Sequence, residues 1–182
     1  MAITPETRDY RTFEVRALDT GEEDKQYRVE GYAAVFDEET VLYEYDGIEY
    51  KEVIDRSAIT GAEMRDVVMN YNHGGKPVAR TKNGTLQLTV DTRGLRISAD
   101  LSGTEEGRRL YEEIRGGYLD QMSFAFTVNK QEYDRAKHLR RITGFKRVFD
   151  VAAVDIPAYD GTSIAARSWA KAEAEREHAE AD

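Results

Sequence analysis

Hydrophobic and polar residues alternate along much of the chain with the two-residue period of a β-strand. The alternation is clearest between Leu119 and Val128, where one face of the predicted strand receives bulky apolar side chains: Met122, Phe124, Phe126 and Val128. The other face receives small or polar side chains: Gln121, Ser123, Ala125 and Thr127. We therefore expect Ser123 on the small, polar side of a strand that its opposite face anchors in the core.

Several other segments have the β-branched, aromatic or alternating composition of strands. They are residues 27–36, 50–54, 67–69, 86–90, 95–101, 139–142 and 145–156. Turn residues at 91–94 predict a hairpin between the two strands that flank them. The acidic and aromatic segment 37–46 breaks the pattern. The segment 70–75 is rich in turn residues, which places His73 at the end of a strand.

Short helices are predicted between these strands. Asp55 can cap a helix that runs through Met64, and Ser102 with Glu105 fits a capping box for a helix that ends at the glycine pair 116–117. Many strands with two or three short helices indicate an α+β protein. We expect a bent antiparallel, β-barrel-like sheet with the helices packed outside it.

The length of 182 residues suits one domain of ordinary size, which we assign to residues 1–168. After Trp169 the chain is rich in helix-forming residues but contains almost no residues suited to a core. We therefore expect residues 169–182 to be a charged, exposed and mobile C-terminal tail.

Composition narrows the functional classes. The 26 Lys and Arg against 35 Asp and Glu give a formal net charge of -9, which would repel a nucleic acid backbone. Without cysteines, and with three histidines that show no His-x-x-x-His spacing, the chain is not expected to bind a metal or another cofactor. No apolar run approaches the roughly 20 residues of a membrane span, and no export signal opens the chain, so we expect no membrane partner.

Catalysis by this chain would therefore depend on hydroxyls, carboxylates and few imidazoles. A serine becomes a nucleophile when a neighbouring base removes its proton, and Ser123 and His73 could meet across a sheet. Each also has a simpler explanation, since a strand serine is usually a small filler and a histidine in a turn often caps a backbone group. His138 follows a charged turn and His178 lies in the predicted tail, so His73 is the preferred base.

Asp150 is the preferred residue to orient the histidine. It is expected on the same strand face as Ala152 and Val154, whose small side chains would leave room for an imidazole, whereas Asp155 is on the opposite face. The alternative is that Asp150 is an ordinary exposed carboxylate. A group of basic residues nearby could bind an acidic partner, although such groups are more often solvated hairpins: Lys137, Arg140, Arg141, Lys146 and Arg147.

Five segments in order resemble the HK97-like prohead protease family of tailed phages. They are residues 29–36 (VEGYAAVF), 50–59 (YKEVIDRSAI), 71–73 (YNH), 114–126 (IRGGYLDQMSFAF) and 149–162 (FDVAAVDIPAYDGT). The most specific element is the Met-Ser-Phe centre of the fourth segment. Each segment alone is a weak signal, but their order and spacing make coincidence a poor explanation.

The resemblance implies a fold related to the herpesvirus assemblin proteases and a serine endopeptidase that acts inside the prohead, in the cytoplasm of the bacterial host. Its substrates would be the scaffold protein or the scaffolding segment of the major capsid protein, and the protease itself; a homo-oligomer is compatible with this role. The resemblance assigns the nucleophile to Ser123 and the base to His73. The position of Asp150 is often glutamate in phage relatives and a histidine in herpesvirus relatives, so the third role stays open.

Two other functions compete with this interpretation. A catalytically silent β-barrel that binds scaffold or capsid proteins would keep the same core pattern, and only a pairing of Ser123 with His73 would separate the two. An esterase or amidase for small substrates would be expected to carry a Gly-x-Ser-x-Gly elbow, which this sequence lacks.

Overall fold

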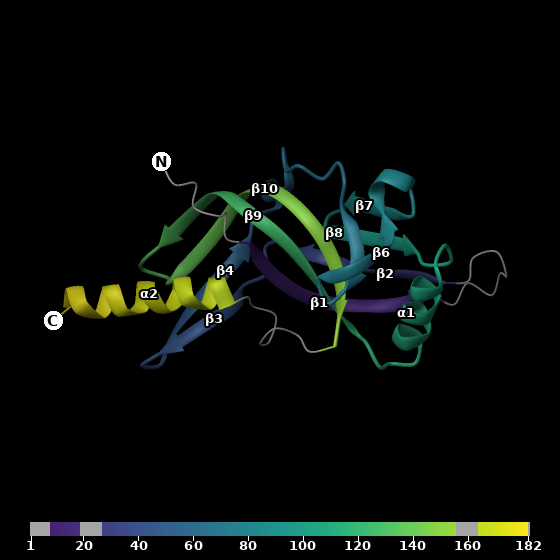
Figure 1. Cartoon of the computed structure of the whole chain (residues 1–182). Coiled ribbons are helices and arrows are strands. Elements are labelled where there is room, and N and C mark those ends of the chain that lie inside the picture. The colour runs from purple at the N-terminus through teal and green to yellow at the C-terminus, as the bar shows by residue number, and fades with distance from the viewer. Residues whose placement is uncertain (1–7, 19–26, 156–163, 182) are drawn as a thin grey trace, which may run out of the picture.

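The computed structural model describes residues 8–18, 27–155 and 164–181 (Figure 1). These residues form ten strands and two α-helices. The strands are β1 (Asp9–Leu18), β2 (Arg28–Val35), β3 (Thr40–Tyr45), β4 (Ile48–Ile54), β5 (Val68–Tyr71), β6 (Gly74–Arg80), β7 (Leu86–Val90), β8 (Gly94–Asp100), β9 (Gln121–Asp134) and β10 (Leu139–Val154). The helices are α1 (Glu105–Arg115) and α2 (Ile164–Ala181), with 3₁₀ turns η2 (Arg56–Ile59) and η3 (Thr81–Asn83).

All ten strands belong to one sheet, in the order β3-β4-β10-β9-β1-β2-β8-β7, with β5 and β6 added beside β10. Most neighbours are antiparallel, but β10 pairs in parallel with β4 near its start and with β5 near its end. Among the described residues, the two end strands β3 and β7 do not pair with each other, so the sheet is open. The predicted α+β class fits, whereas the expectation of an antiparallel, barrel-like sheet is corrected to an open, mixed one.

Strands β9 and β10 form the centre of the sheet. The rings of Phe124 and Phe126 of β9 and of Phe145 of β10 contact one another, with centroids 4.6–5.9 Å apart. The predicted alternation in β9 is confirmed, because Met122, Phe124 and Phe126 are fully buried. The small face of β9 is buried as well, since Ser123, Ala125 and Thr127 are each at most 4% exposed.

Other elements depart from the sequence-based expectation. The segment predicted to break the pattern contains β3, which pairs antiparallel with β4. The turn expected at Thr143 and Gly144 is a register irregularity inside one 16-residue strand, β10. Strands β1 and β6 were not predicted. Helix α1 is capped by the Thr104 hydroxyl, which accepts from the Gly107 N–H at 2.9 Å, and not by Ser102.

One buried ion-pair network ties four strands together. Arg11 of β1 donates two hydrogen bonds of 2.7 Å to Glu52 of β4, and Arg140 of β10 donates a third of 2.9 Å. Arg140 also donates to Gln131 of β9. Arg140 is only 6% exposed, so this member of the basic group is committed to the interior and does not face a partner.

Helices α1 and α2 lie at opposite ends of the sheet (Figure 1). Helix α2 packs against the β3–β4 hairpin, where Ala170 and Ala174 are fully buried in a small cluster with Leu42 and Tyr50. Trp169 meets the Tyr133 ring edge-on at 5.3 Å. The expected exposure of residues 169–182 is therefore wrong for Ala170 and Ala174. The predicted domain limit at residue 168 falls inside this helix.

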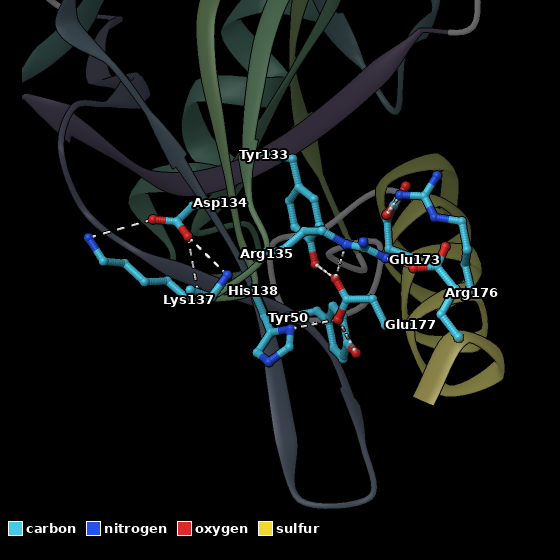
Figure 2. Close-up of polar contacts among 11 residues, drawn as sticks. Tyr50, Tyr133, Asp134, Arg135, Lys137, His138, Glu173, Arg176 and Glu177 are labelled. Atoms are coloured by element: carbon cyan, nitrogen blue, oxygen red, sulfur yellow. Dashed lines mark hydrogen bonds and ion pairs between the residues drawn. The ribbon is translucent and has the colours of Figure 1, made fainter. Parts of the chain in front are cut away.

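A single carboxylate makes most of the polar contacts that attach α2 (Figure 2). Glu177 accepts hydrogen bonds from the hydroxyls of Tyr50 at 3.1 Å and Tyr133 at 2.9 Å. It also forms ion-pair contacts with His138 Nδ1 at 2.8 Å and Arg135 Nε at 3.6 Å. Composition alone missed this docking because it depends on small side chains and one polar residue.

Among the described residues, no helix is long and apolar enough to cross a membrane.

Candidate active site

The register of three strands places Ser123 in a row with two other residues. Ser123 of β9 lies opposite Ala152 of β10, and Ala152 lies opposite Asn70 of β5. In the next row, Ala125, Asp150 and Val68 are paired in the same way. Because directly paired residues present their side chains to the same face of a sheet, Ser123, Asp150 and Asn70 share one face.

His73 lies in a two-residue turn between β5 and β6. Tyr71 pairs with Gly74, and the two residues between them, Asn72 and His73, have positive φ angles of 48° and 57°. This is the pattern of a type I′ hairpin turn, which non-glycine residues adopt at a cost of about 1–2 kcal/mol each. The prediction that His73 lies at a strand end is confirmed.

The turn is attached to the end of β10 by two hydrogen bonds. The Asn72 N–H donates to the Ala153 carbonyl at 2.9 Å, and the Asn72 side-chain oxygen accepts from the Asp155 N–H at 3.3 Å. These bonds fix the turn beside the strand that carries Asp150. The left-handed conformation of His73 is therefore held by the sheet itself.

His73 and Asp150 are in direct contact. Nδ1 of the His73 ring shares a hydrogen bond with Oδ1 of Asp150, although 77 residues separate them in the chain. The Asp150 side chain is 10% exposed and the His73 side chain 21% exposed, so this contact is largely shielded from water. The other carboxylate considered from the sequence, Asp155, accepts a hydrogen bond from the Tyr71 hydroxyl at 2.7 Å instead.

Ser123 and Asp150 thus lie on one strand face, and His73 of the neighbouring turn is joined to Asp150. Ser123 is 4% exposed and has small neighbours, because Ala125 and Ala152 beside it are fully buried methyl-bearing residues. The contact to Asp150 favours the tautomer with the proton on Nδ1, which leaves Nε2 of His73 able to accept a proton. A hydroxyl, an imidazole and an ordering carboxylate are the groups that nucleophilic acyl transfer requires.

The remaining histidines have other surroundings. His138 contacts Glu177, and its ring lies 4.9 Å from that of Tyr50. His178 of α2 lies 3.9 Å from Asp46 and packs edge-on against Tyr45. Within the described ranges no three histidine, cysteine or acidic side chains gather in a way that could hold a metal ion.

Sequence reasoning missed Asn70. It was assigned to the turn-rich segment before His73, but the structure places it inside β5, 7% exposed and in the row of Ser123. A signal was available. Val68 and Asn70 alternate with the apolar Val67 and Met69, so the period of two already put the amide on the face opposite the core.

Comparison with known proteins identifies the group to which the chain belongs. The chain belongs to the caudovirus prohead serine protease family, whose family model matches residues 11–177. The match confirms the family expected from the sequence and makes the chain a serine protease of phage capsid maturation. The comparison with curated proteins and the comparison with solved structures each found no match.

Proposed function

We propose that this protein is a serine endopeptidase in which Ser123 is the nucleophile, His73 the general base and Asp150 the residue that orients His73. One observation carries the assignment. The His73 ring is bonded through Nδ1 to Asp150, and Asp150 belongs to the strand face that carries Ser123. Family membership supports the chemistry, and the sheet register supports the choice of residues.

In the proposed reaction, Ser123 Oγ attacks the carbonyl carbon of a peptide bond while its proton passes to His73 Nε2. The tetrahedral intermediate then collapses, the C–N bond breaks, and His73 returns the proton to the leaving amine. Water repeats the sequence on the acyl-enzyme and releases the carboxylic acid. Such proton transfer by a positioned side chain contributes about 10²–10⁴-fold in rate. Asp150 stabilises the charged imidazole that forms at each step.

The proposed substrates are the scaffold protein or the scaffolding segment of the major capsid protein, and the protease itself. The site of action would be the interior of the prohead, in the cytoplasm of the bacterial host. A fold related to the herpesvirus assemblin proteases is part of the same proposal, and the α+β class is compatible with it. Because Ser123 lies on a strand within a sheet, a substrate would have to be locally extended to reach it, so cleavage should favour exposed or fraying segments.

The test is a digestion experiment with matched serine variants. The parent chain, Ser123→Ala and Ser98→Ala would each be incubated with casein, with the scaffold and capsid proteins of the same phage, and with a panel of small esters. Ser98 is a half-buried serine of β8 and serves as the control. We expect the parent and Ser98→Ala to cut the proteins and Ser123→Ala to leave them intact while it remains folded.

Mass spectrometry of the products, and of the protease after storage, would identify the cleaved bonds and any cleavage of the chain itself. Activity of Ser123→Ala within about tenfold of the parent, which is only about 1.4 kcal/mol of barrier, would exclude Ser123 as the nucleophile. Turnover of esters without cleavage of any protein would favour the small-substrate hydrolase instead.

A further inference from the structure

Besides the proposed catalytic residues, a further polar side chain, that of Asn70, lies on the strand face of Ser123 and Asp150. Asn70 is 7% exposed, and its side-chain oxygen Oδ1 is buried without a hydrogen-bond partner in the part of the chain that the structure describes. Buried polar atoms in native proteins are nearly always hydrogen-bonded, and the exceptions often belong to functional sites. The position of this oxygen therefore requires an explanation.

The position of Asn70 relates it to Ser123. The two residues are separated by Ala152 alone, and each step across the sheet is about 4.8 Å, so their backbones are about 10 Å apart. Ala152 contributes only a methyl group between them. The chain continues from Asn70 to His73 within three residues, so the amide lies at the base of the turn that carries the histidine.

We propose that Asn70 is a substrate-binding residue whose Oδ1 accepts a hydrogen bond from a main-chain N–H of the peptide bound at Ser123. This inference rests on the proposed function and adds to it a contact that recognises peptides as a class. The Oδ1 atom needs a hydrogen-bond donor, and an extended peptide carries donor N–H groups along its whole length. About 10 Å corresponds to three residues of extended chain, so the N–H lies within about three residues of the scissile bond.

This contact distinguishes a peptide from an ester analogue. A depsipeptide, in which one amide N–H is replaced by oxygen, keeps its shape but leaves Oδ1 without a donor, and such unpaired buried groups give strong discrimination. The contact forms equally in the bound substrate and in the transition state. Its loss should therefore raise KM and leave kcat nearly unchanged.

The experiment compares Asn70→Leu with the parent and with Thr127→Val. Thr127 is a matched control, because its hydroxyl is also buried without a hydrogen-bond partner among the described residues and lies on the same face of β9, four residues from Ser123. The substrate is a fluorogenic peptide that spans the first bond cut in a casein digest. A series of depsipeptides replaces, one at a time, each N–H within three residues of that bond.

We expect the parent and Thr127→Val to lose about tenfold in kcat/KM at one depsipeptide position. Asn70→Leu should raise KM for the all-amide peptide about tenfold and show no further loss at that position. Its melting temperature should equal or exceed that of the parent, because an unpaired buried polar group has been replaced by an apolar one of similar shape. A stability effect therefore cannot account for the change in KM.

Two results would overturn the inference. One is a depsipeptide loss in Asn70→Leu as large as in the parent, and the other is a fall in kcat at constant KM, which would mean that Asn70 acts on His73 and not on substrate. Both leave the proposed function intact as long as cleavage depends on Ser123. Cleavage that persists in Ser123→Ala would instead refute the proposed function, whatever Asn70→Leu does.

Discussion

Two histidines of this protein share a local geometry and differ in what surrounds them. His73 and His138 both have a left-handed backbone, with φ of 57° and 49°, and each directs Nδ1 toward a carboxylate. The partner is Asp150 for His73 and Glu177 for His138. The two rings are 21% and 28% exposed. By these measures alone, either histidine could be a base held by an acid.

The two carboxylates differ in the donors they meet. Glu177 is surrounded by the hydroxyls of Tyr50 and Tyr133 and by the Arg135 guanidinium as well as His138 (Figure 2). Burial by itself would raise the pKa of Glu177, but the hydrogen bonds from the two tyrosines and the charge of His138 outweigh it, so this pKa lies below its usual value. The carboxylate is thus held as an anion that attaches α2.

Asp150, in contrast, shares its strand face with a serine one strand away. Its histidine comes from a strained turn that is bonded to the same strand. The comparison teaches that a histidine–carboxylate contact does not define a catalytic site by itself. The two pairs differ in that the strand face of Asp150 also carries Ser123, and four predictions test whether this difference decides which pair is catalytic.

The largest difference is expected between His73→Ala and His138→Ala. Removal of the base should lower kcat by about 10⁵–10⁶-fold, as the loss of a catalytic histidine does in serine proteases. His138→Ala should keep kcat within about twofold, because Glu177 retains its other donors. Steady-state kinetics on the fluorogenic peptide measures both. Comparable losses in the two variants would mean that the sheet face does not distinguish them.

Asp150→Asn should have the next largest effect. The amide keeps the shape of the side chain but favours the wrong tautomer of His73, so kcat should fall about 10⁴-fold while the protein stays folded. Asp150→Glu should be far milder, because a carboxylate one methylene longer can still reach the ring. Asp155→Asn is the control and should lose little, since Asp155 bonds to Tyr71. A large loss in Asp155→Asn with normal turnover in Asp150→Asn would reverse the assignment.

Glu177→Gln should lower stability without affecting turnover. Glutamine cannot make charge-assisted contacts with His138 and Arg135, and hydrogen bonds to charged groups contribute about 1.5–3 kcal/mol. For a domain of this size the melting temperature should fall by roughly 3–10 °C. Glu175→Gln is the control on the same helix, because Glu175 is 60% exposed and contacts only Lys171 among the described ion pairs. Equal melting temperatures for the two variants would show that Glu177 does not hold α2.

The smallest expected effect is a pH dependence of the stability that the Glu177 contacts provide. The lowered pKa of Glu177 means that its contribution is complete above the usual glutamate pKa of about 4.5 and is lost as the pH falls below it. Burial, followed by the hydrogen bond to Glu177, raises the pKa of Tyr50 to about 12, so its contribution is complete below pH 10 and lost between pH 10 and about 12. The melting-temperature difference between parent and Glu177→Gln should therefore narrow in acid and in strong alkali. A difference that stays constant down to pH 3 would contradict this linkage.

The candidate site could be predicted from the sequence to the extent that period-two patterns are strong. The alternation of large and small residues in β9 fixed the face of Ser123, and the same parity on β10 separated Asp150 from Asp155. The sequence pattern did not place Asn70 in a strand, because its neighbours Tyr71 and Asn72 indicated that the turn had already begun. Local sequence does not show where a four-residue strand ends.

Strand β6 and helix α2 could not be predicted, for different physical reasons. Gly74, Gly75 and Pro77 look like a loop, and they form a strand because β6 pairs only with β5 among the described strands, so that a proline at this sheet edge is tolerated. Helix α2 buries alanines and one glutamate against Tyr50 and Tyr133. These partners are 127 and 44 residues away from Glu177, and composition contains no sign of them.

The position of β10 in the chain has a consequence for when the protein becomes active. The candidate site combines residues from a turn after β5, from β9 and from β10, and β1 pairs with β9 across more than a hundred residues, as Asp9 and Phe126 illustrate. Contacts of such long range form late and slowly in folding. A nascent chain that has not yet released β10 lacks Asp150 and the strand to which the His73 turn is bonded. The proposed site is therefore incomplete until β10 has been synthesised and has paired with β5 and β9, so we expect the protease to be inactive during its own synthesis.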